Sequence, residues 1–243
     1  CNCKKIQDFS PISKLERLEI LNANKTYISD FSFLEKNKII KKLDISSCEK
    51  IKDFTTISKL ERLEILNANS TYISDISFLE INKNIKILEL SFCFNIKDFT
   101  PISKLERLEI LEIIHTNISD ISFLEKNKNL KKLNLECCKN IKDFTPLSKL
   151  ERLEILEINY TNISDISFLE KNKNLIKLNL ECCKNIKEFT PLSKLERLEI
   201  LNIKYTNISD ISFLEKNKNI KYLDTDGCNN INKKDNIKRI SLI

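Results

Sequence analysis

The sequence is poor in glycine, histidine, methionine and tryptophan. Its 243 residues include one glycine, one histidine, and neither methionine nor tryptophan. A chain with a single glycine lacks the glycine-rich loops that hold phosphates, so nucleotide-binding motifs of that kind are excluded. The single histidine, His115, stands in no recognisable motif with a nucleophile or a carboxylate. We therefore expect that the protein is not an enzyme and that it uses no cofactor.

Long apolar runs and a strong charge imbalance are missing as well. No stretch approaches the roughly 18 uninterrupted apolar residues of a transmembrane helix. The first residues, CNCKKIQDFS, lack the apolar run of a signal peptide. The 41 basic residues exceed the 35 acidic ones only slightly, which is not typical of a nucleic-acid-binding protein. We expect no partner among nucleic acids, membranes or small-molecule substrates.

What the sequence has in abundance is internal repetition. The phrase SKLERLEIL recurs every 45 residues, with its serine at 13, 58, 103, 148 and 193. Each period divides into repeats of 22 and 23 residues that share the skeleton L-x-x-L-x-[LI]-x-x-[TC]. Ten skeletons begin at Leu18, Ile40, Leu63, Ile85, Leu108, Leu130, Leu153, Leu175, Leu198 and Ile220. We predict one domain over residues 1–243, with partial repeats at both ends.

The skeleton also predicts the architecture of each repeat. Its L-x-L alternation has a period of two, which indicates a short strand. One such strand cannot bury its apolar face alone, whereas repeats stacked in parallel bury a continuous core. The returning segments carry helix-start signals: the Thr-Pro pairs at 100–101, 145–146 and 190–191, with Thr as the predicted N-cap, and the phrase SDISFL. Because these segments are short, we expect 3-10 or α turns on the convex side.

At this point the repeats resemble leucine-rich repeats over essentially the whole chain. Those with LxxLxIxxTxISDISFL are similar to the bacterial-internalin and phosphatase-regulator type, with Thr where that type usually has Asn. Those with LxxLxLxxCxxIKxFTPL are similar to the cysteine-containing type of F-box proteins. The Lys, Asn and Ile bias resembles the leucine-rich-repeat families of large AT-rich DNA viruses. The resemblance implies an α/β solenoid, a horseshoe with a parallel concave sheet that usually binds the partner.

Two faces follow from the skeleton. Positions one, four, six and nine are predicted to point into the core, and positions three, five, seven and eight to the concave surface. Position eight varies most between otherwise near-identical repeats, and it carries Phe92, His115, Tyr160 and Tyr205 in the middle and C-terminal repeats. Aromatic residues on an open surface suit a protein-binding hot spot. Alternatively, they pack on one another and shield the edge of the sheet.

The predicted concave surface also has an acidic centre. Position five carries only acids and amides, and position seven adds further carboxylates. This pattern allows a basic partner, although an ordinary solvated surface has the same composition. The predicted partner-binding residues are Phe92, Glu112, Ile114, His115, Glu136, Cys137, Glu157, Tyr160, Glu181, Cys182, Tyr205 and Tyr222.

The nine cysteines raise the question of disulfides and metal sites. Six of them, at 3, 48, 93, 138, 183 and 228, recur every 45 residues at position nine, with a threonine repeat between neighbours. Two strand spacings separate equivalent Cα atoms by about 9.6 Å, whereas a disulfide needs no more than about 7 Å. We predict reduced, buried thiols at position nine and outward-facing thiols at Cys137 and Cys182. Without CxxC-like spacing, no metal site is expected.

The compartment is a weaker inference. Sequons at Asn24, Asn69, Asn117, Asn162 and Asn207 would permit glycosylation in a secreted protein. The free thiols and the missing signal peptide favour the cytoplasm. Both ends of the chain lie within repeats and have no evident polar cap, so we expect a longer native protein or ends that pack on something.

The leading functional hypothesis is a non-enzymatic scaffold that binds a protein partner, of unknown identity, on its concave face. Two alternatives come from other classes. The cysteine-type repeats suggest the substrate-recognition part of a ubiquitin ligase. The internalin-like repeats suggest a secreted or surface adhesin.

Overall fold

The computed structural model describes residues 8–229 and 231. The chain forms two compact units, residues 1–118 and residues 119–243. Cys3 and the last residues, 236–243, where a partial repeat is predicted, lie outside the described part of the chain. The expectation of a single domain stays a prediction.

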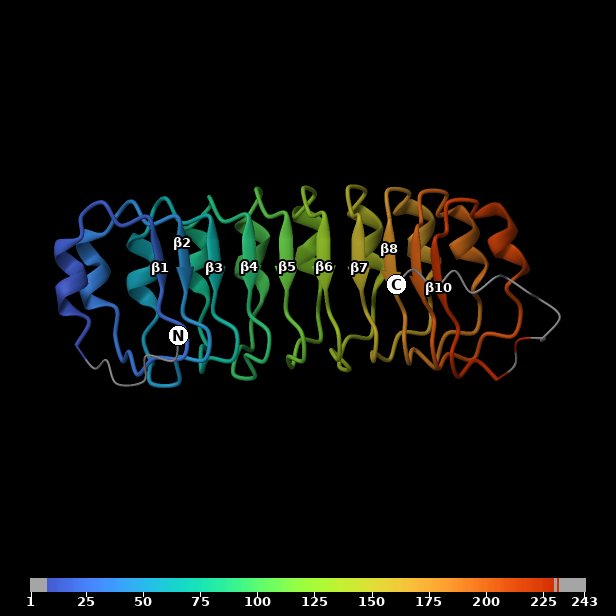
Figure 1. Ribbon diagram of the computed structural model, residues 1–243, viewed down its shortest axis with the longest axis horizontal. Helices are drawn as coiled ribbons and strands as arrows, with labels where there is room; N and C mark the ends of the chain where they lie inside the picture. The colour runs from blue at the N-terminus through green and yellow to red at the C-terminus, as the bar shows by residue number, and fades with distance from the viewer. Residues whose placement is uncertain (1–7, 230, 232–243) are drawn as a thin grey trace. The chain divides into compact units, whose positions relative to one another are not determined.

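The N-terminal unit alternates five 3-10 helices with five strands (Figure 1). The elements are η1 (Ser10–Lys14), β1 (Ile20–Asn22), η2 (Ser32–Lys36), β2 (Lys42–Asp44), η3 (Thr55–Lys59), β3 (Ile65–Asn67), η4 (Ser77–Glu80), β4 (Ile87–Glu89), η5 (Thr100–Lys104) and β5 (Ile110–Glu112). The strands pair in parallel in chain order. Equivalent skeleton positions face each other, as at Leu21 and Leu43.

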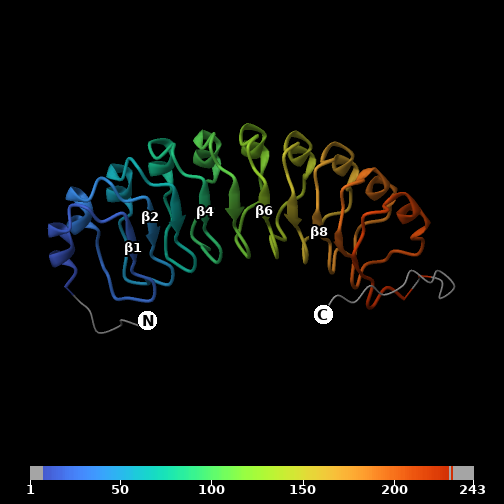
Figure 2. The ribbon, with the colours of Figure 1, turned by 45° about the horizontal axis from the view of Figure 1, so that its top comes forward.

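The C-terminal unit repeats this plan. Its elements are η6 (Ser122–Lys126), β6 (Lys132–Asn134), η7 (Thr145–Lys149), β7 (Ile155–Glu157), η8 (Ser167–Lys171), β8 (Lys177–Asn179), η9 (Thr190–Lys194), β9 (Ile200–Asn202), η10 (Ser212–Lys216) and β10 (Tyr222–Asp224). The strands again pair in parallel in chain order. In each unit the strands lie on one side and the 3-10 helices on the other (Figure 2). The predicted parallel sheet and 3-10 turns are confirmed.

The core lies between the strands and the 3-10 helices of each unit. Positions one, four, six and nine are buried throughout the inner repeats, as in the second, where Ile40, Leu43, Ile45 and Cys48 are fully covered. In the terminal repeats, which have a neighbour on one side only, Leu18 and Leu223 are half-buried. This gradient is expected when each repeat buries its apolar residues against its neighbours.

Side chains also tie each repeat to the one before it. A buried asparagine ends every second 3-10 helix and donates its amide to backbone carbonyls of the preceding repeat. Asn82 Nδ2 reaches the carbonyl oxygens of Ile57 (3.2 Å) and Leu60 (3.0 Å), and Asn172 does the same at Leu147 and Leu150. Each of these carbonyls also accepts a backbone N–H, since the N–H of Leu60 donates to Ile57 and that of Leu63 donates to Leu60. The amide therefore adds a second hydrogen bond, which comes from the next repeat. The asparagine is therefore a clamp between repeats.

The 3-10 helices begin differently from the prediction. The predicted N-cap threonines, such as Thr100, are the first residues of their helices, and the N-cap positions hold core residues such as Phe99, which make no side-chain capping bond. The carboxylate two residues before the helix takes that role, because Asp98 Oδ1 accepts the backbone N–H of Thr100 at 2.8 Å. The threonine prediction was wrong because an aspartate competes better for this N–H and leaves a buried position for phenylalanine.

The same arrangement predicts sensitivity to acid. The N–H and hydroxyl of Thr100 lower the pKa of Asp98 from its ordinary value, and equivalent donors lower the pKa of Asp53 and Asp143. A carboxylate with a lowered folded-state pKa stabilises the fold above the unfolded pKa of about 4 and loses this effect as pH falls through the folded pKa. Urea denaturation from pH 6 to pH 2 is expected to show falling stability.

Asp98→Asn keeps the Oδ1 acceptor and removes the titration, so its loss of stability between pH 6 and pH 2 is expected to be smaller. Asp98→Ala removes the acceptor and should be less stable than the parent protein at pH 6. Parallel pH curves for the parent protein and Asp98→Asn would contradict the assignment.

Candidate partner-binding surface

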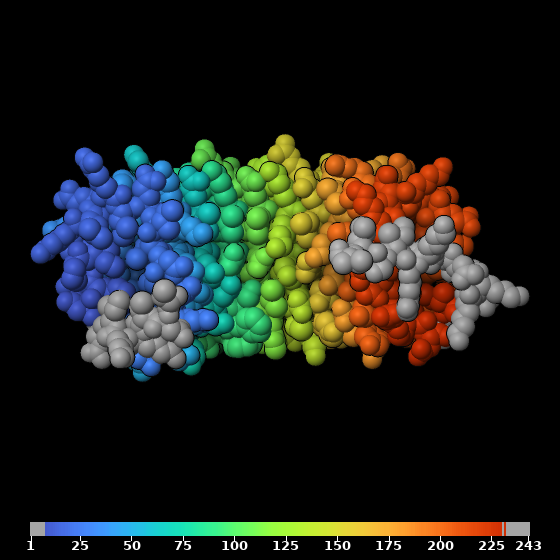
Figure 3. All heavy atoms as spheres, in the orientation of Figure 1, coloured from blue at the N-terminus to red at the C-terminus, as the bar shows by residue number. Residues whose placement is uncertain are grey.

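The candidate surface is the solvent-facing side of the strands, which we call the strand face. It is the predicted concave surface, and side chains of consecutive repeats lie on it in contiguous bands (Figure 3). Position three contributes half-buried isoleucines in both units, such as Ile65, Ile110 and Ile155. Ile20, at the start of the first sheet, is 61% exposed. The centre of this face is therefore apolar as well as acidic.

Every strand ends at position five, and in the repeats with Asn or Asp there a side-chain bond accompanies the change of direction. Where position five is Asn or Asp, its Oδ1 accepts the backbone N–H of position seven, as between Asn67 and Asn69 at 3.0 Å. Such a local bond replaces the strand ladder by a turn. Hydrogen bonds between repeats continue beyond it, since the N–H of Ser70 donates to the carbonyl of Ser91 at 2.8 Å. The amides at position five thus have a structural role that the prediction did not include.

Position eight lies in this turn and not in a strand. In all ten repeats it has a φ between +52° and +73°, the left-handed region. Only Gly227 has the residue type that adopts this region without strain. The nine others are Lys25, Ser47, Ser70, Phe92, His115, Cys137, Tyr160, Cys182 and Tyr205. Their side chains leave the turn at the edge of the strand face. The prediction that they face outward because residues alternate along a strand therefore gave the wrong reason.

In the N-terminal unit, position eight contributes to an exposed aromatic cluster. The ring centroids of Phe92 and His115 lie 5.5 Å apart, and Phe94 lies 5.6 Å from His115 and 6.4 Å from Phe92. Both phenylalanines stay exposed, at 42% and 50%. The rings therefore pack on one another and still present apolar surface, so both predicted alternatives hold in part. Glu112 and Ile114, the other predicted residues of this unit, are half-buried.

Phe94 was missed by the sequence reasoning because it stands at position ten, outside the skeleton. A signal was present. The equivalent residues of the other cysteine-type repeats are polar, namely Glu49, Lys139, Lys184 and Asn229. A phenylalanine there departs from the repeat as clearly as Phe92 does two residues earlier.

In the C-terminal unit the position-eight tyrosines are joined to charged neighbours. Tyr160 donates its hydroxyl to Glu181 Oε1 at 2.7 Å, and this bond raises the pKa of the Tyr160 phenol. Tyr205 lies beside Lys204, whose Nζ is 5.9 Å from the ring centroid. The rings are 38% and 48% exposed. Tyr222 lies on β10 and donates to Asp224 Oδ2 at 2.9 Å.

The acidic centre of the strand face is partly neutralised. Lys177 Nζ lies 2.8 Å from Glu157 Oε1, and Lys204 Nζ lies 3.6 Å from Asp224 Oδ2. The Asp224 carboxylate raises the pKa of Lys204. Both carboxylates are mostly covered, whereas Glu136 and Glu181 are half-exposed and no ion pair of theirs is seen in the described part of the chain. Glu136 and Glu181 therefore keep a negative charge on the strand face.

The thiols divide as predicted except at Cys228, which is half-exposed in the last described repeat, where a neighbouring repeat is described on one side only. Cys48, Cys93, Cys138 and Cys183 are unpaired and fully buried. Each of the three whose bonds are seen donates its Sγ to the backbone carbonyl of position six in the preceding repeat, as Cys183 does to Ile158 at 3.2 Å. Cys137 and Cys182 are unpaired and half-exposed. Within the described residues no group of three or more His, Cys, Asp or Glu side chains is placed to hold a metal ion.

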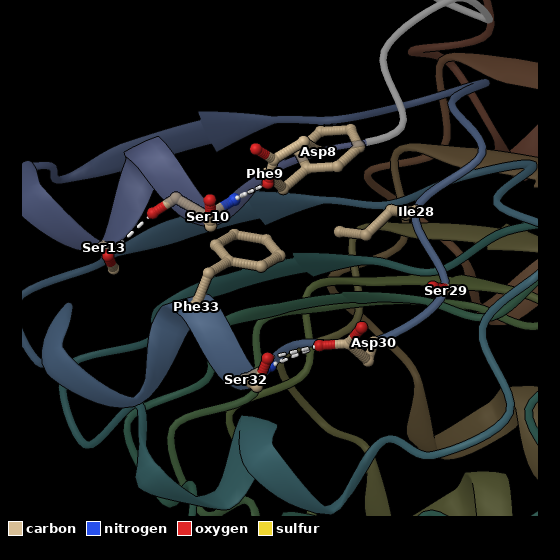
Figure 4. Close-up of a pocket in the computed structure, with 9 residues that line it drawn as sticks. All are labelled: Asp8, Phe9, Ser10, Ser13, Ile28, Ser29, Asp30, Ser32 and Phe33. Atoms are coloured by element: carbon tan, nitrogen blue, oxygen red, sulfur yellow. Dashed lines mark hydrogen bonds between the residues drawn. The ribbon is translucent and has the colours of Figure 1, made fainter.

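A hollow of about 290 Å³ opens between η1 and η2 (Figure 4). Phe9 and Phe33 stack across it with ring centroids 5.7 Å apart. The backbone N–H of Ser10 and that of Ser32 donate to the carboxylates of Asp8 and Asp30. The hollow is therefore lined by carboxylates and serine side chains as well as by the two rings. No described helix is long and apolar enough to cross a membrane.

Known proteins share this repeat geometry. The family model for leucine-rich repeats, in two copies, matches residues 106–149. The chain is a leucine-rich-repeat protein. An internalin from Listeria monocytogenes is similar to it over 89% of this chain and 64% of that chain, with 27% identity and a TM-score of 0.78. Curated protein sequences contain no match.

Two further solved structures share the leucine-rich-repeat fold. The functional domain of InlJ from Listeria monocytogenes, which includes a cysteine ladder, has 21% identity and a TM-score of 0.70 over 96% of this chain and 53% of that one. The ectodomain of the Arabidopsis thaliana receptor kinase GASSHO1/SCHENGEN3, in complex with CASPARIAN STRIP INTEGRITY FACTOR 2, has 17% identity and a TM-score of 0.66 over 89% and 28%. This leucine-rich-repeat protein spans less than two thirds of each of the three. None of them supports the resemblance to viral families.

The thiol environments predict selective alkylation. Burial raises the pKa of Cys183 to about 11 and also raises that of Cys93. Because the thiolate is the reactive form, iodoacetamide at pH 8 should modify half-exposed Cys182 well before Cys183 in the folded protein, as read by peptide mass spectrometry. In urea the two should react alike. Equal rates in the folded protein would show that the position-nine thiols are accessible.

The backbone of position eight predicts a cost at the one glycine. A Cβ on Gly227 would collide with the ring of Tyr205, and a φ of +73° disfavours any side chain there. Gly227→Ala is expected to lower the free energy of unfolding by roughly 1–2 kcal/mol, measured by urea denaturation. In a Tyr205→Ser background the collision disappears and only the backbone cost should remain. An unchanged urea midpoint in both backgrounds would rule out the left-handed conformation.

Proposed function

We propose that this leucine-rich-repeat protein is a non-enzymatic scaffold that binds a protein partner on its strand face. The observation that carries the proposal is position eight, where exposed Phe, His and Tyr side chains replace small ones in an otherwise near-identical array. Bulky side chains in the left-handed region are uncommon. Strained residues of this kind cluster at binding sites. The relatives give general support, since leucine-rich-repeat ectodomains include one solved in complex with CASPARIAN STRIP INTEGRITY FACTOR 2.

The chemistry of the strand face suits protein recognition. Tyrosine and phenylalanine provide large contact areas, and they are enriched among residues that dominate binding energy. Half-buried isoleucines at position three extend the apolar surface around them. Charged groups at Glu136 and Glu181 add a polar component that would orient a partner. No catalytic constellation is proposed.

Two compartments remain as proposals. We favour the cytoplasm, because half-exposed free thiols such as Cys182 persist best under reducing conditions. The similarity to a bacterial internalin favours the second candidate function, a secreted or surface adhesin. Sequon occupancy in the native protein separates them. The amides of Asn117, Asn162 and Asn207 are exposed, and each donates to a carbonyl of the preceding repeat. The ubiquitin-ligase alternative stays a prediction.

Partner capture with paired substitutions tests the scaffold role. Tyr160→Ala combined with Tyr205→Ala removes the two exposed rings of the C-terminal unit and is expected to weaken capture of the native partner at least about 10-fold, as hot-spot aromatics do. Phe92→Ser combined with Phe94→Ser tests the N-terminal cluster in the same way. The affinity of each variant is then measured by titration with the purified, identified partner.

Ile81→Ser is the matched control. Ile81 is 62% exposed and directly follows η4, away from the strand face, so its loss should leave capture unchanged. Urea denaturation of each variant verifies the fold. Full-strength capture by both paired variants with intact folds would remove the strand face as the binding site.

A further inference from the structure

Asn159 differs from its equivalents on the strand face. It stands at position seven of the β7 repeat, between Glu136 and Glu181 in the adjacent repeats. Backbone bonds fix this order, because the N–H of Cys137 donates to the carbonyl of Asn159 and that of Tyr160 to the carbonyl of Glu181. The Asn159 side chain is 3% exposed, and its Oδ1 has no hydrogen-bond partner within the described part of the chain.

The other asparagines at position seven donate their side-chain amide to the following repeat. Asn24 Nδ2 donates to Asp44 Oδ2 at 3.3 Å, and Asn69 Nδ2 donates to Glu89 Oε2 at 3.1 Å. Asn69 Oδ1 also accepts the backbone N–H of Ser91 at 2.6 Å. Each amide is therefore held by the repeat that follows it.

The repeat after Asn159 removes both of these partners. Its position five is Asn179, which offers no carboxylate for an amide to donate to. Asn179 Oδ1 itself accepts the backbone N–H of Glu181 at 3.1 Å, so this donor is not left for Asn159 Oδ1. A buried acceptor without a donor is destabilising by roughly 1–3 kcal/mol. The Oδ1 atoms of Asn82 and Asn172 also lack a donor, but the Nδ2 groups of these residues bond to the preceding repeat. Asn159 makes no side-chain bond of either kind within the described residues, which points to a bond made with another molecule.

The surroundings of Asn159 restrict that molecule to one with positive charge. The half-exposed carboxylates of Glu136 and Glu181 flank it. Glu181 accepts the hydroxyl of Tyr160 and the amide of Asn202, which leaves its negative charge in place. The nearby Lys177 and Lys204 are already paired with Glu157 and Asp224. The region therefore carries an excess of negative charge beside an unused amide acceptor.

We propose that this region binds an extended, basic segment of the protein partner, an inference that rests on the proposed scaffold function. An asparagine side chain offers one acceptor and two N–H donors, so it pairs with the N–H and C=O of a peptide backbone. Lysine or arginine side chains of the segment pair with Glu136 and Glu181 through charge-assisted hydrogen bonds. Because Asn159 Oδ1 is covered in the free protein, binding includes a side-chain rotation, a change that is common at interfaces.

A synthetic peptide tests this without knowledge of the native partner. The capped peptide acetyl-Gly-Arg-Gly-Arg-Gly-amide is titrated into the full chain by calorimetry at low salt, in parallel with its Gln-for-Arg counterpart. The Arg peptide is expected to bind, and the Gln peptide at least 10-fold more weakly. Asn159→Leu and Glu136→Gln should each weaken the Arg peptide at least 10-fold, whereas Glu170→Gln, an equally charge-reducing change on exposed η8, should not.

Asn159→Leu also separates binding from folding. Leucine has nearly the same size and removes the orphan acceptor, so the urea midpoint should be unchanged or higher. A lower midpoint would assign Asn159 a structural role and overturn the proposal, as would equal binding of the Arg and Gln peptides or undiminished binding by Asn159→Leu.

Capture of the native partner separates failure of the basic-segment proposal from failure of the scaffold proposal. Capture that falls with Tyr160→Ala and Tyr205→Ala but is indifferent to Asn159→Leu and Glu136→Gln would leave the strand face as a binding surface and remove the basic segment.

Discussion

The structure depends on one constraint: no repeat of 22 or 23 residues can complete its own hydrogen bonds or bury its own leucines. Backbone N–H groups of each repeat donate to carbonyls of the next repeat. These bonds continue past the end of the strand, as from the N–H of Lys25 to the carbonyl of Ser46. Side chains add to this connection. The asparagines after every second 3-10 helix donate to carbonyls of the preceding repeat, and the position-nine thiols donate to a carbonyl one repeat earlier. Stability therefore accumulates between neighbours, which is why the terminal repeats are the least buried.

This dependence on neighbours explains why position eight can vary. Its left-handed backbone is held by the bonds of adjacent repeats and by the position-five turn, not by its own side chain. Lysine, serine, cysteine, phenylalanine and tyrosine are all accommodated there, each at some conformational cost. The side chain leaves the turn at the edge of the strand face, where it affects recognition more than folding. A near-identical array can thus acquire an individual surface by changing one residue per repeat, and the aromatic cluster around His115 is the clearest case.

Polar residues on the strand face divide between folding and recognition, and the division depends on neighbours. Asn67 ends a strand, and Glu157 is paired with Lys177. Both the Nδ2 and the Oδ1 of Asn69 have hydrogen-bond partners in the following repeat. The same residue type at Asn159 is released because the following repeat has an amide at position five instead of a carboxylate. The strand face therefore has more acidic residues than unpaired negative charges that a partner would meet. Only the groups that the fold has not paired are open to a partner, and Glu136, Asn159 and Glu181 lie together in the C-terminal unit.

The sequence by itself determined the repeat length, the buried positions, the parallel strands with 3-10 returns, and the separation of buried from half-exposed thiols. These follow from a periodic pattern, and each requires only that like repeats stack. It did not determine that strands end after position five, that Asp98 rather than Thr100 closes the start of a helix, or that Phe94 joins Phe92 and His115. Nor did it reveal that Asn159 is unused. Such features arise where a particular side chain meets a particular backbone group, often in the next repeat. The tertiary structure decides them because it alone shows which donors and acceptors the stacking has already satisfied.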